Sequence, residues 1–191
     1  MQGKSSLRRK LRQSRRNLSV TAQRQAAQSL ACVLLRQPII QRAQKIALYW
    51  PSDGEISALP LLKRLQQQGK KVYLPVIKPA QGMEFKALSL RYLKSNQFGI
   101  VEPLAGESIA VKRLDIILMP LVGFDEQGGR LGMGGGYYDR ALAFKLRQTW
   151  NNKPYLIGLA HEQQKIAHLP IDPWDVPMAA VATDKRFIRV S

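Results

Sequence analysis

A glycine-rich stretch at residues 123–140 constrains the fold of this chain more than any other segment. It reads GFDEQGGRLGMGGGYYDR, and it lies between an apolar run at 114–120 (LDIILMP) and a helix-like segment at 137–150. Glycine lets a backbone approach a phosphate closely, and the first turn of a helix presents free N–H groups to an anion. The order strand, glycine loop, helix therefore predicts an α/β fold with a phosphate-binding loop.

The rest of the chain alternates helical and strand-like patterns. Periodic apolar residues and capping signals predict helices at residues 3–16, 19–36 (with Ser19 as N-cap), 57–68 and 138–148. Short apolar runs predict strands at residues 45–50, 71–77, 114–119, 155–160, 179–183 and 186–190, with 84–90 as a strand or hairpin arm and 91–113 mostly loop. Strand, helix, strand at this spacing is typical of a parallel sheet with helices on its faces. We therefore expect an α/β fold in a single domain over residues 1–191, with a mostly parallel open sheet and a ligand-binding crevice at the carboxyl ends of its strands.

Positive charge is concentrated in the first quarter of the chain. The formal net charge is +17, and residues 1–52 hold eleven Lys and Arg but no Asp or Glu. Such an excess favours anionic partners, whether nucleic acid, a membrane surface or small polyanionic substrates. A basic nucleic-acid-binding protein is therefore one alternative, although the segment lacks interleaved aromatic residues. An Arg-rich, acid-poor N-terminus is also typical of a mitochondrial transit peptide.

The composition argues against two other classes of protein. Cys32 is the single cysteine, which excludes an intramolecular disulfide and favours a reducing compartment. No apolar run reaches the ~18 residues of a membrane span, and no apolar h-region follows the basic start. We expect a cytoplasmic protein with Cys32 as a small core residue.

The glycine loop matches neither of the common nucleotide-binding fingerprints. A GxGxxG pattern from Gly132 needs glycine where Tyr137 stands, and no Gly-Lys-Ser/Thr is present. Arg130 nevertheless offers donors suited to phosphate oxygens, and Asp139, in the first turn of the following helix, can hold Mg²⁺. Together these features indicate a nucleoside-triphosphate site. A simple turn with a first-turn acid, or an enzyme acting on sugar phosphates, stays open as an alternative.

Four separated blocks of this sequence resemble one known family. RLGMGGGYYDR, preceded by LDIILMPLVGFDEQGG, is similar to the signature of 5-formyltetrahydrofolate cyclo-ligases, also called methenyltetrahydrofolate synthetases. KSSLRRKLR at the start, ALYWPSDGEIS after the first predicted strand and LPIDPWDVPMAAVATD near the end resemble the family in matching order. The resemblance covers nearly the whole chain.

The resemblance implies a reaction, a fold and partners. The reaction is the ATP- and Mg²⁺-dependent conversion of 5-formyltetrahydrofolate to 5,10-methenyltetrahydrofolate with release of ADP and phosphate, through phosphorylation of the formyl oxygen and ring closure by N10. The implied fold is a Rossmann-like three-layer arrangement, similar to sugar-phosphate isomerases and CoA-transferases. The expected partners are ATP and 5-formyltetrahydrofolate, including polyglutamylated forms, with a monomeric chain and neither a membrane nor nucleic acid as partner.

The resemblance also implies roles for residues of the matched motifs. For ATP these are Lys4, Arg8, Arg130, Leu131, Gly132, Met133, Gly134, Gly135, Gly136, Tyr137 and Tyr138. For the folate they are Trp50, Glu55, Met133, Gly134, Gly135, Gly136 and Tyr137. The implied metal ligands are Asp139 and Asp175, with Asp172 and Asp184 as alternatives to Asp175. The implied catalytic residues are Arg130, Tyr137 and Asp139.

The chemistry of these side chains agrees with the implied roles. Lys4 and Arg8 are four residues apart, so they share a helix face and can clasp phosphates. An aromatic ring such as Trp50 or Tyr137 can stack on a flat pterin, and a carboxylate such as Glu55 can accept hydrogen bonds from its N–H groups.

One position departs from the family pattern. Many members read GxGKGYYD, with a lysine where this chain has Gly135. The phosphate charge must then be neutralised by Arg130, Lys4, Arg8 or another cation. His161 and His168 lie outside the matched motifs, and we expect them to be structural or exposed.

Overall fold

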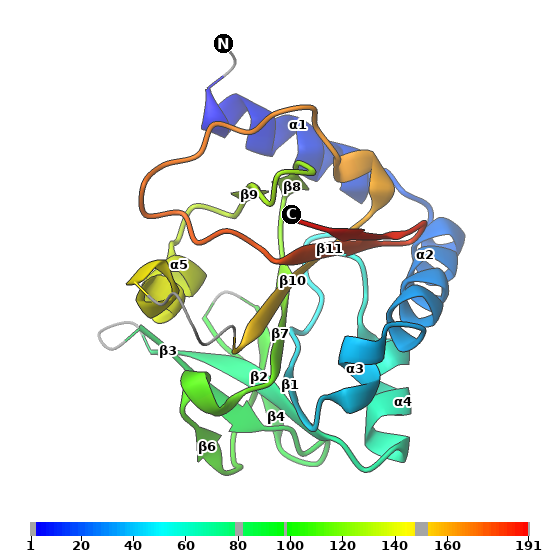
Figure 1. Cartoon of the computed structure of the whole chain (residues 1–191). Coiled ribbons are helices and arrows are strands. Elements are labelled where there is room, and N and C mark those ends of the chain that lie inside the picture. The colour runs from blue at the N-terminus through cyan, green and yellow to red at the C-terminus, as the bar shows by residue number, and fades with distance from the viewer. Residues whose placement is uncertain (1–2, 79–81, 98, 148–152, 191) are drawn as a thin grey trace.

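The chain folds around one eight-stranded sheet, seen here in a computed structural model that describes residues 3–78, 82–97, 99–147 and 153–190 (Figure 1). The strand order is β12-β11-β10-β7-β1-β2-β3-β6. Its strands are β1 (Lys45–Ala47), β2 (Lys71–Lys78), β3 (Gly82–Ala87), β6 (Ser108–Ile109), β7 (Ile116–Pro120), β10 (Tyr155–Ala160), β11 (Ala180–Thr183) and β12 (Phe187–Arg189). The five strands from β11 to β2 run parallel, whereas β12, β3 and β6 pair antiparallel at the two edges. The predicted mostly parallel α/β sheet is therefore confirmed.

Helices cover both faces of this sheet, which gives three layers. The α-helices are α1 (Lys4–Arg16), α2 (Val20–Leu35), α3 (Pro38–Arg42), α4 (Leu59–Gln67) and α5 (Tyr137–Leu142). The 3₁₀ helices are η1 (Val111–Arg113), η2 (Ala143–Arg147) and η3 (Glu162–Gln164), and two small sheets pair β4 (Leu93–Ser95) with β5 (Val101–Pro103) and β8 (Gly123–Phe124) with β9 (Arg130–Leu131). In Figure 1, α2, α3 and α4 lie on one side of the sheet, α5 lies on the other, and α1 crosses one end.

Two large apolar clusters of the core lie one on each face of the sheet, and a third, smaller cluster joins Leu11 of α1 to Val122, Leu131 and Leu169. Along β7, Ile116 and Leu118 pack into the cluster under α2 and α4, while Ile117 and Met119 pack into the opposite cluster beside α5. Successive side chains of a strand point to opposite faces, so a central parallel strand with both faces covered must be apolar at every position. This explains why the run at 114–120 lacks the alternation of a half-exposed strand.

Most predicted helices and strands are present, with local differences. Ser19 caps α2 as predicted, because its side chain accepts a hydrogen bond from the Ala22 N–H at 3.2 Å. The strand predicted at 45–50 ends at Ala47, since the chain leaves the sheet before Pro51. After the glycine loop, α5 has six residues and continues as η2, and the prediction for residue 148 lies outside the described residues.

The prediction for Cys32 was wrong, because this side chain is exposed. The buried face of α2 is formed by Ala26, Ala27, Leu30, Ala31 and Leu34. Cys32 belongs to the opposite side of that helix. Among the helices that the structure describes, none has the length and apolarity needed to cross a membrane.

Candidate functional site

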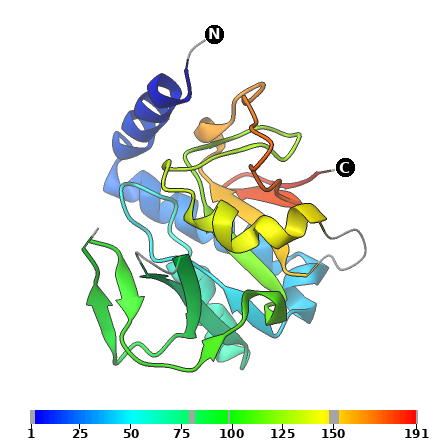
Figure 2. The same cartoon turned by 90° about the vertical axis from the view of Figure 1, so that its left-hand side faces the viewer.

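A cavity of about 1110 Å³ lies at the carboxyl ends of the parallel strands β1, β2 and β7, where the crevice is predicted. Its walls come from α1, the segment after β1, the end of β2, the glycine loop, α5 and the loop before β11. Figure 2 shows α1, the β2–β3 hairpin and α5 together on one side of the molecule, although they are distant in sequence. The volume exceeds the ~300–1000 Å³ of an ordinary small-molecule pocket. The cavity therefore has room for more than one ligand.

Every residue for which the family resemblance implies a role lines this cavity. They are Lys4, Arg8, Trp50, Glu55, Arg130, Leu131, Gly132, Met133, Gly134, Gly135, Gly136, Tyr137, Tyr138, Asp139 and Asp175. Asp172 also lines it, whereas Asp184 does not and instead accepts a hydrogen bond from the Glu162 N–H. His161 is buried outside the cavity and His168 is exposed, so both are structural or exposed as expected.

The cavity face of α1 carries three cations at intervals of four residues. Lys4, Arg8 and Arg12 all line the cavity, because side chains four apart lie one above the other on a helix. The Arg8 Nε donates to the Gly132 carbonyl at 2.8 Å, which joins α1 to the glycine loop. Sequence reasoning reached the first two cations and missed Arg12, although the same spacing could have identified it.

The N-terminal end of α1 is tied to the loop before β11. The Lys4 Nζ lies 2.6 Å from a carboxylate oxygen of Asp172 and 3.0 Å from one of Asp175. Burial opposes the charged form, but the hydrogen bonds to these two carboxylates outweigh it and raise the pKa of Lys4. The two acids that compete for a metal role therefore share one lysine.

The glycine loop is shaped by backbone conformations that only glycine adopts easily. Gly134 has φ +99° and Gly136, the N-cap of α5, has φ +62°. Gly135 has ordinary backbone angles, but a Cβ there would lie 3.0 Å from the Tyr137 ring. The Arg140 guanidinium lies over that ring, 5.0 Å from its centroid. A lysine at 135 would consequently require Tyr137 to move.

Arg130 and Asp139 form an ion pair on the wall of the cavity. The Arg130 side chain is 6% exposed, and its Nε has no hydrogen-bond partner among the described residues. The same holds for the hydroxyl of Tyr138, whose pKa is raised by burial. Buried polar atoms are nearly always hydrogen-bonded in native proteins, so two orphaned donors at one cavity point to a ligand that satisfies them.

The carboxylates at the cavity do not form a closed metal site. The described part of the chain contains no group of three or more His, Cys, Asp and Glu side chains that could enclose an ion. Asp139 and Asp175 both line the cavity, and each is paired with a cation. Mg²⁺ is commonly bound by one or two carboxylates together with substrate phosphates. This donor set therefore fits a Mg²⁺ ion that arrives with a polyphosphate.

The loop after β1 supplies another wall of the cavity. Glu55 has a side chain that is 9% exposed, and it accepts hydrogen bonds from the Ser52 N–H at 3.0 Å and the Ser52 hydroxyl at 3.3 Å. Burial raises the pKa of Glu55, and the positive charge of Arg15 opposes that rise. Trp50, which also lines the cavity, is half-buried and packs against the core.

Sequence reasoning missed several residues of the cavity. Glu102, from the β4–β5 sheet, is 3% exposed and accepts from the Ile77 N–H at 2.9 Å. Trp174, from the loop before β11, lies at the cavity with 64% of its surface exposed. The elements around Glu102 are too short to give a clear pattern, whereas Trp174 stands between the two acids that were considered.

Proteins of known name and structure are similar to this chain over nearly its whole length. The model of a family described as the 5-formyltetrahydrofolate cyclo-ligase family matches residues 1–184. The 5-formyltetrahydrofolate cyclo-ligase of Haemophilus influenzae is 43% identical over 185 residues, which is 93% of this chain and 95% of that protein. The protein of the same name from Escherichia coli K12 is 37% identical over 187 residues, covering 92% of this chain and 97% of its own.

A solved structure is similar over the same extent. The NMR structure of Aquifex aeolicus 5,10-methenyltetrahydrofolate synthetase matches with a TM-score of 0.85 at 34% identity, covering 98% of this chain and 92% of its own. Fold, motifs and sequence identity thus agree over nearly the full length. The chain belongs to the 5-formyltetrahydrofolate cyclo-ligase family.

Proposed function

We propose that this protein converts 5-formyltetrahydrofolate to 5,10-methenyltetrahydrofolate, with ATP as co-substrate, Mg²⁺ as cofactor, and ADP and phosphate as the other products. The observation that carries the proposal is the convergence of four separated segments on one cavity, which is lined by the residues for which the family resemblance implies a role. Family membership supports the cyclo-ligase activity. The details of ATP and Mg²⁺ use rest on the chemistry of the side chains.

The ATP side is formed by α1 and the glycine loop. Lys4, Arg8 and Arg130 are cations at one cavity, and the hydrogen bond from Arg8 to Gly132 holds its guanidinium against the loop. Planar guanidinium groups suit phosphate oxygens. Gly135 adds no cation, so the phosphate charge is neutralised by these three side chains together with the other cations of the cavity, Arg12 and Arg140. The free Arg130 Nε is the donor that a phosphate oxygen would satisfy.

Asp139 and Asp175 would hold the Mg²⁺, which would neutralise charge on the phosphates of ATP. Both are carboxylates, the ligand type that Mg²⁺ prefers. Each is held in the absence of metal by a cation that also belongs to the proposed ATP site, Arg130 for Asp139 and Lys4 for Asp175. These ion pairs hold the carboxylates in place.

The folate side is formed by Trp50, Glu55 and the loop residues 133–137. A pterin is flat and carries N–H donors, so it needs a stacking surface and an acceptor. Trp50 and Tyr137 supply rings, and Glu55 supplies a largely buried carboxylate. The loop residues 133–137 lie between the two ligands, and Tyr137 orients the folate towards the phosphate.

The reaction has two steps in this proposal. The formyl oxygen attacks the γ-phosphorus of ATP, so an O–P bond forms, the bond from phosphorus to the bridging oxygen breaks, and ADP leaves. N10 then attacks the activated formyl carbon, the C–O bond to the phosphate breaks, and N10 gives up its proton. Phosphoryl transfer of this kind depends on positioning and on charge stabilisation rather than on a protein nucleophile. Arg130 is the cation best placed for that stabilisation, because it is nearly buried at the wall of the cavity.

The proposal is tested by mixing the protein with MgATP and 5-formyltetrahydrofolate and following near-ultraviolet absorbance. We expect the absorbance of the conjugated methenyl product to appear, and to be absent when either ATP or Mg²⁺ is omitted. Folded protein that gives no product with all components present would refute the proposed function.

A further inference from the structure

Arg15, in the last turn of α1, is a buried cation that no part of the proposed mechanism uses. Its side chain is 0% exposed, and it does not line the cavity. Burying a guanidinium is costly unless its donors are paired. The groups that accept hydrogen bonds from Arg15 should therefore show why its guanidinium is buried.

The partners of Arg15 come from the walls of the cavity. Its Nε donates to the Asp53 carbonyl at 2.8 Å, one terminal nitrogen donates to the Leu121 carbonyl at 3.0 Å, and the other donates to the Asp53 carboxylate at 2.8 Å. That second nitrogen also lies 3.8 Å from the Glu55 carboxylate and 4.0 Å from the Met133 sulfur. One side chain thus links the segments after β1 and β7 with the glycine loop.

The loop that Arg15 holds has an unusual backbone. Asp53 has φ +52°, the only positive φ among the described non-glycine residues, and Gly54 follows with φ +73°. A non-glycine residue keeps such a conformation only where its surroundings stabilise it. Arg12, Arg15 and Arg16 all pair with the Asp53 carboxylate. The position of Glu55, two residues further on, depends on this arrangement.

The positive charge of Arg15 lowers the pKa of Glu55, which burial raises. The groups that act on the Glu55 carboxyl include Ser52, Asp53, Tyr49, Tyr138 and two cations, Arg12 and Arg15. Of the two cations, Arg15 is the fully buried one, and its terminal nitrogen lies 3.8 Å from a Glu55 carboxylate oxygen. Burial raises the pKa of Glu55, so loss of the guanidinium would raise it further and favour the protonated form.

We propose that Arg15 is a positioning residue for folate binding, which fixes the loop of residues 52–55 and the Glu55 carboxylate without touching the substrate. The inference rests on the proposed function, in which Glu55 accepts hydrogen bonds from the folate. Because α1 also carries Lys4 and Arg8, one helix then serves both ligands: one face for ATP and its last turn for the folate.

The test compares Arg15→Gln with Arg16→Gln, a matched control that also pairs with Asp53 but is exposed and lies outside the cavity. For each, the KM values for folate and ATP are measured across pH, together with the unfolding temperature. We expect Arg15→Gln to raise the KM for folate roughly tenfold, the size of a coupled charge pair, with a much smaller change for ATP. The pH below which folate binding is lost should move upward, because the carboxyl then ionises at a higher pH. Arg16→Gln should raise the KM for folate much less than Arg15→Gln and should not shift the pH profile, because Arg16 is half exposed and pairs with Asp53 rather than with Glu55.

A cycle with Glu55→Gln separates positioning from a merely structural role. In the Glu55→Gln background, Arg15→Gln should have little further effect on the KM for folate. Equal increases in both KM values with an unshifted pH profile, or full additivity in the cycle, would overturn the proposal.

Arg15→Lys covers the case in which Arg15→Gln does not fold. It keeps the charge but cannot reach all the acceptors, so we expect a raised KM for folate with a wild-type pH profile. An unchanged KM for folate would count against the proposal. A wild-type protein that makes no methenyl product would refute the proposed function instead, so the two failures are distinguishable.

Discussion

Single cations of the cavity are held by specific partners before any ligand binds. Arg8 donates to the Gly132 carbonyl, Lys4 is shared by Asp172 and Asp175, and Arg130 is paired with Asp139. Such contacts restrict side chains that would otherwise lose much freedom on binding a ligand. Substitution of one of these cations should therefore weaken the binding of one ligand, either ATP or folate, more than that of the other.

Replacement of Arg8 by glutamine should weaken ATP binding. Hydrogen bonds to charged groups contribute ~1.5–3 kcal/mol, so we expect the KM for ATP to rise roughly ten- to hundredfold with little change for folate. Steady-state kinetics with each substrate varied in turn measures this. The control is Arg9→Gln, because Arg9 is the next residue of α1 but is exposed and outside the cavity. Similar effects from both variants would contradict a specific role for Arg8.

Replacement of Asp139 by asparagine should affect Mg²⁺ use. We expect turnover to fall roughly hundredfold and the Mg²⁺ requirement to rise, since a bound metal contributes several kcal/mol of charge stabilisation. Folate binding without ATP, measured by calorimetry, should stay near wild type. The control is Asp184→Asn, which removes a carboxylate outside the cavity. Loss of folate binding alone would instead identify Asp139 as a structural cap of α5.

Helix α1 is the element on which the site depends most. Its N-terminal end is joined to the loop before β11, its middle to the glycine loop, and its last turn to the loop after β1. The residues joined by these hydrogen bonds are separated by 38 to 168 positions in the sequence. Helix α1 is therefore an integral part of the fold.

The attachment of α1 through Asp53 should depend on pH. Burial opposes ionisation of Asp53, but hydrogen bonds from Arg12, Arg16 and Arg15 outweigh it and lower its pKa to about 2. A lowered pKa contributes stability that is fully present above the unfolded value of 3.8 and is lost as pH falls towards 2. We expect Asp53→Asn to lower the free energy of unfolding at neutral pH, and the difference from wild type to shrink below about pH 4. Urea unfolding at stepped pH measures this, and a difference that does not change with pH would contradict it.

The elements of the fold were predictable where a local pattern defines them. Short local patterns predicted several elements correctly. They are the apolar run of β7, the N-cap of α2 at Ser19 and the glycine that follows α4. The end of β1 at Ala47 was not predictable, because the apolar residues that follow it are buried outside a strand. Cys32 was misplaced although the spacing of Ala27, Leu30, Ala31 and Leu34 puts position 32 on the other face of the helix.

The candidate site was predictable only in part. The motif residues were reached through the family resemblance, and Arg12 follows from the spacing of Lys4 and Arg8. The contact of Arg15 with Asp53 joins segments that are remote in sequence, and no local pattern indicates it. The roles of the site residues, and the single-domain organisation of residues 1–191, stay predictions.

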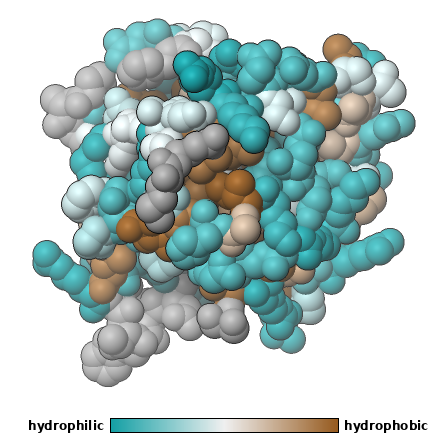
Figure 3. Space-filling view, turned by 90° about the horizontal axis from the view of Figure 1, so that it is seen from above, coloured by the Kyte–Doolittle hydropathy of each residue, from teal (hydrophilic) through white to brown (hydrophobic). Residues whose placement is uncertain are grey.

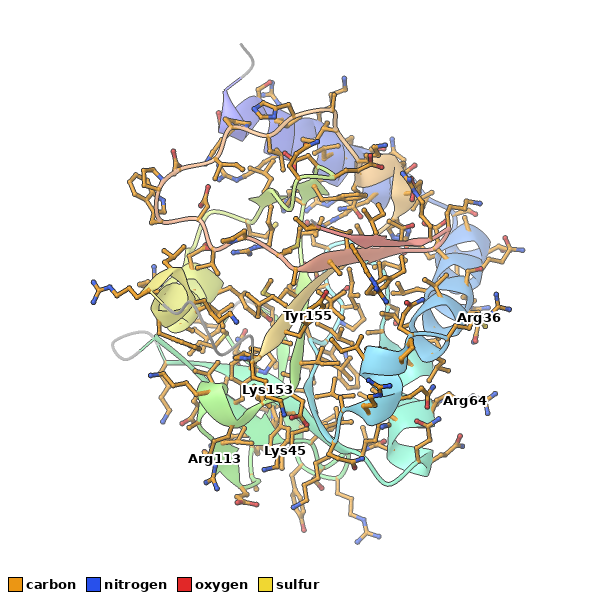
Figure 4. The ribbon with its side chains drawn as sticks, viewed as in Figure 1. Arg36, Lys45, Arg64, Arg113, Lys153 and Tyr155 are labelled. Carbon is orange, nitrogen blue, oxygen red and sulfur yellow. The ribbon has the colours of Figure 1, made fainter. Side chains whose placement is uncertain are left out.

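At the scale of the whole molecule, the excess of positive charge lies outside the cavity. The lining residues include five Lys and Arg but six Asp and Glu, whereas the chain as a whole carries +17. Figure 4 shows Arg36 and Arg64 pointing outward from the helices on one side and Arg113 and Lys45 near the opposite end of the sheet from α1. Viewed from above, the surface is mostly hydrophilic around a central apolar area (Figure 3). We expect the positive electrostatic field of these surface residues to attract ATP and folate, which are both anionic, from a distance.

Charge reversal far from the cavity tests that expectation. The double variant Arg36→Glu, Arg64→Glu should lower kcat/KM at low ionic strength, because the long-range attraction is weakened without a change in the site. At high salt the two proteins should converge, since charges more than ~10 Å apart are screened. An equal loss at every salt concentration would show that the substitutions act on stability or on the site instead.

The fate of the formyl oxygen tests the central claim, that one cavity brings the γ-phosphate of ATP to the formyl group of the folate. The measurement uses 5-formyltetrahydrofolate labelled with heavy oxygen in the formyl group and determines the mass of the released phosphate. We expect each phosphate to contain the labelled atom, because the C–O bond breaks after the O–P bond has formed. Methenyl product formed together with unlabelled phosphate would contradict the account.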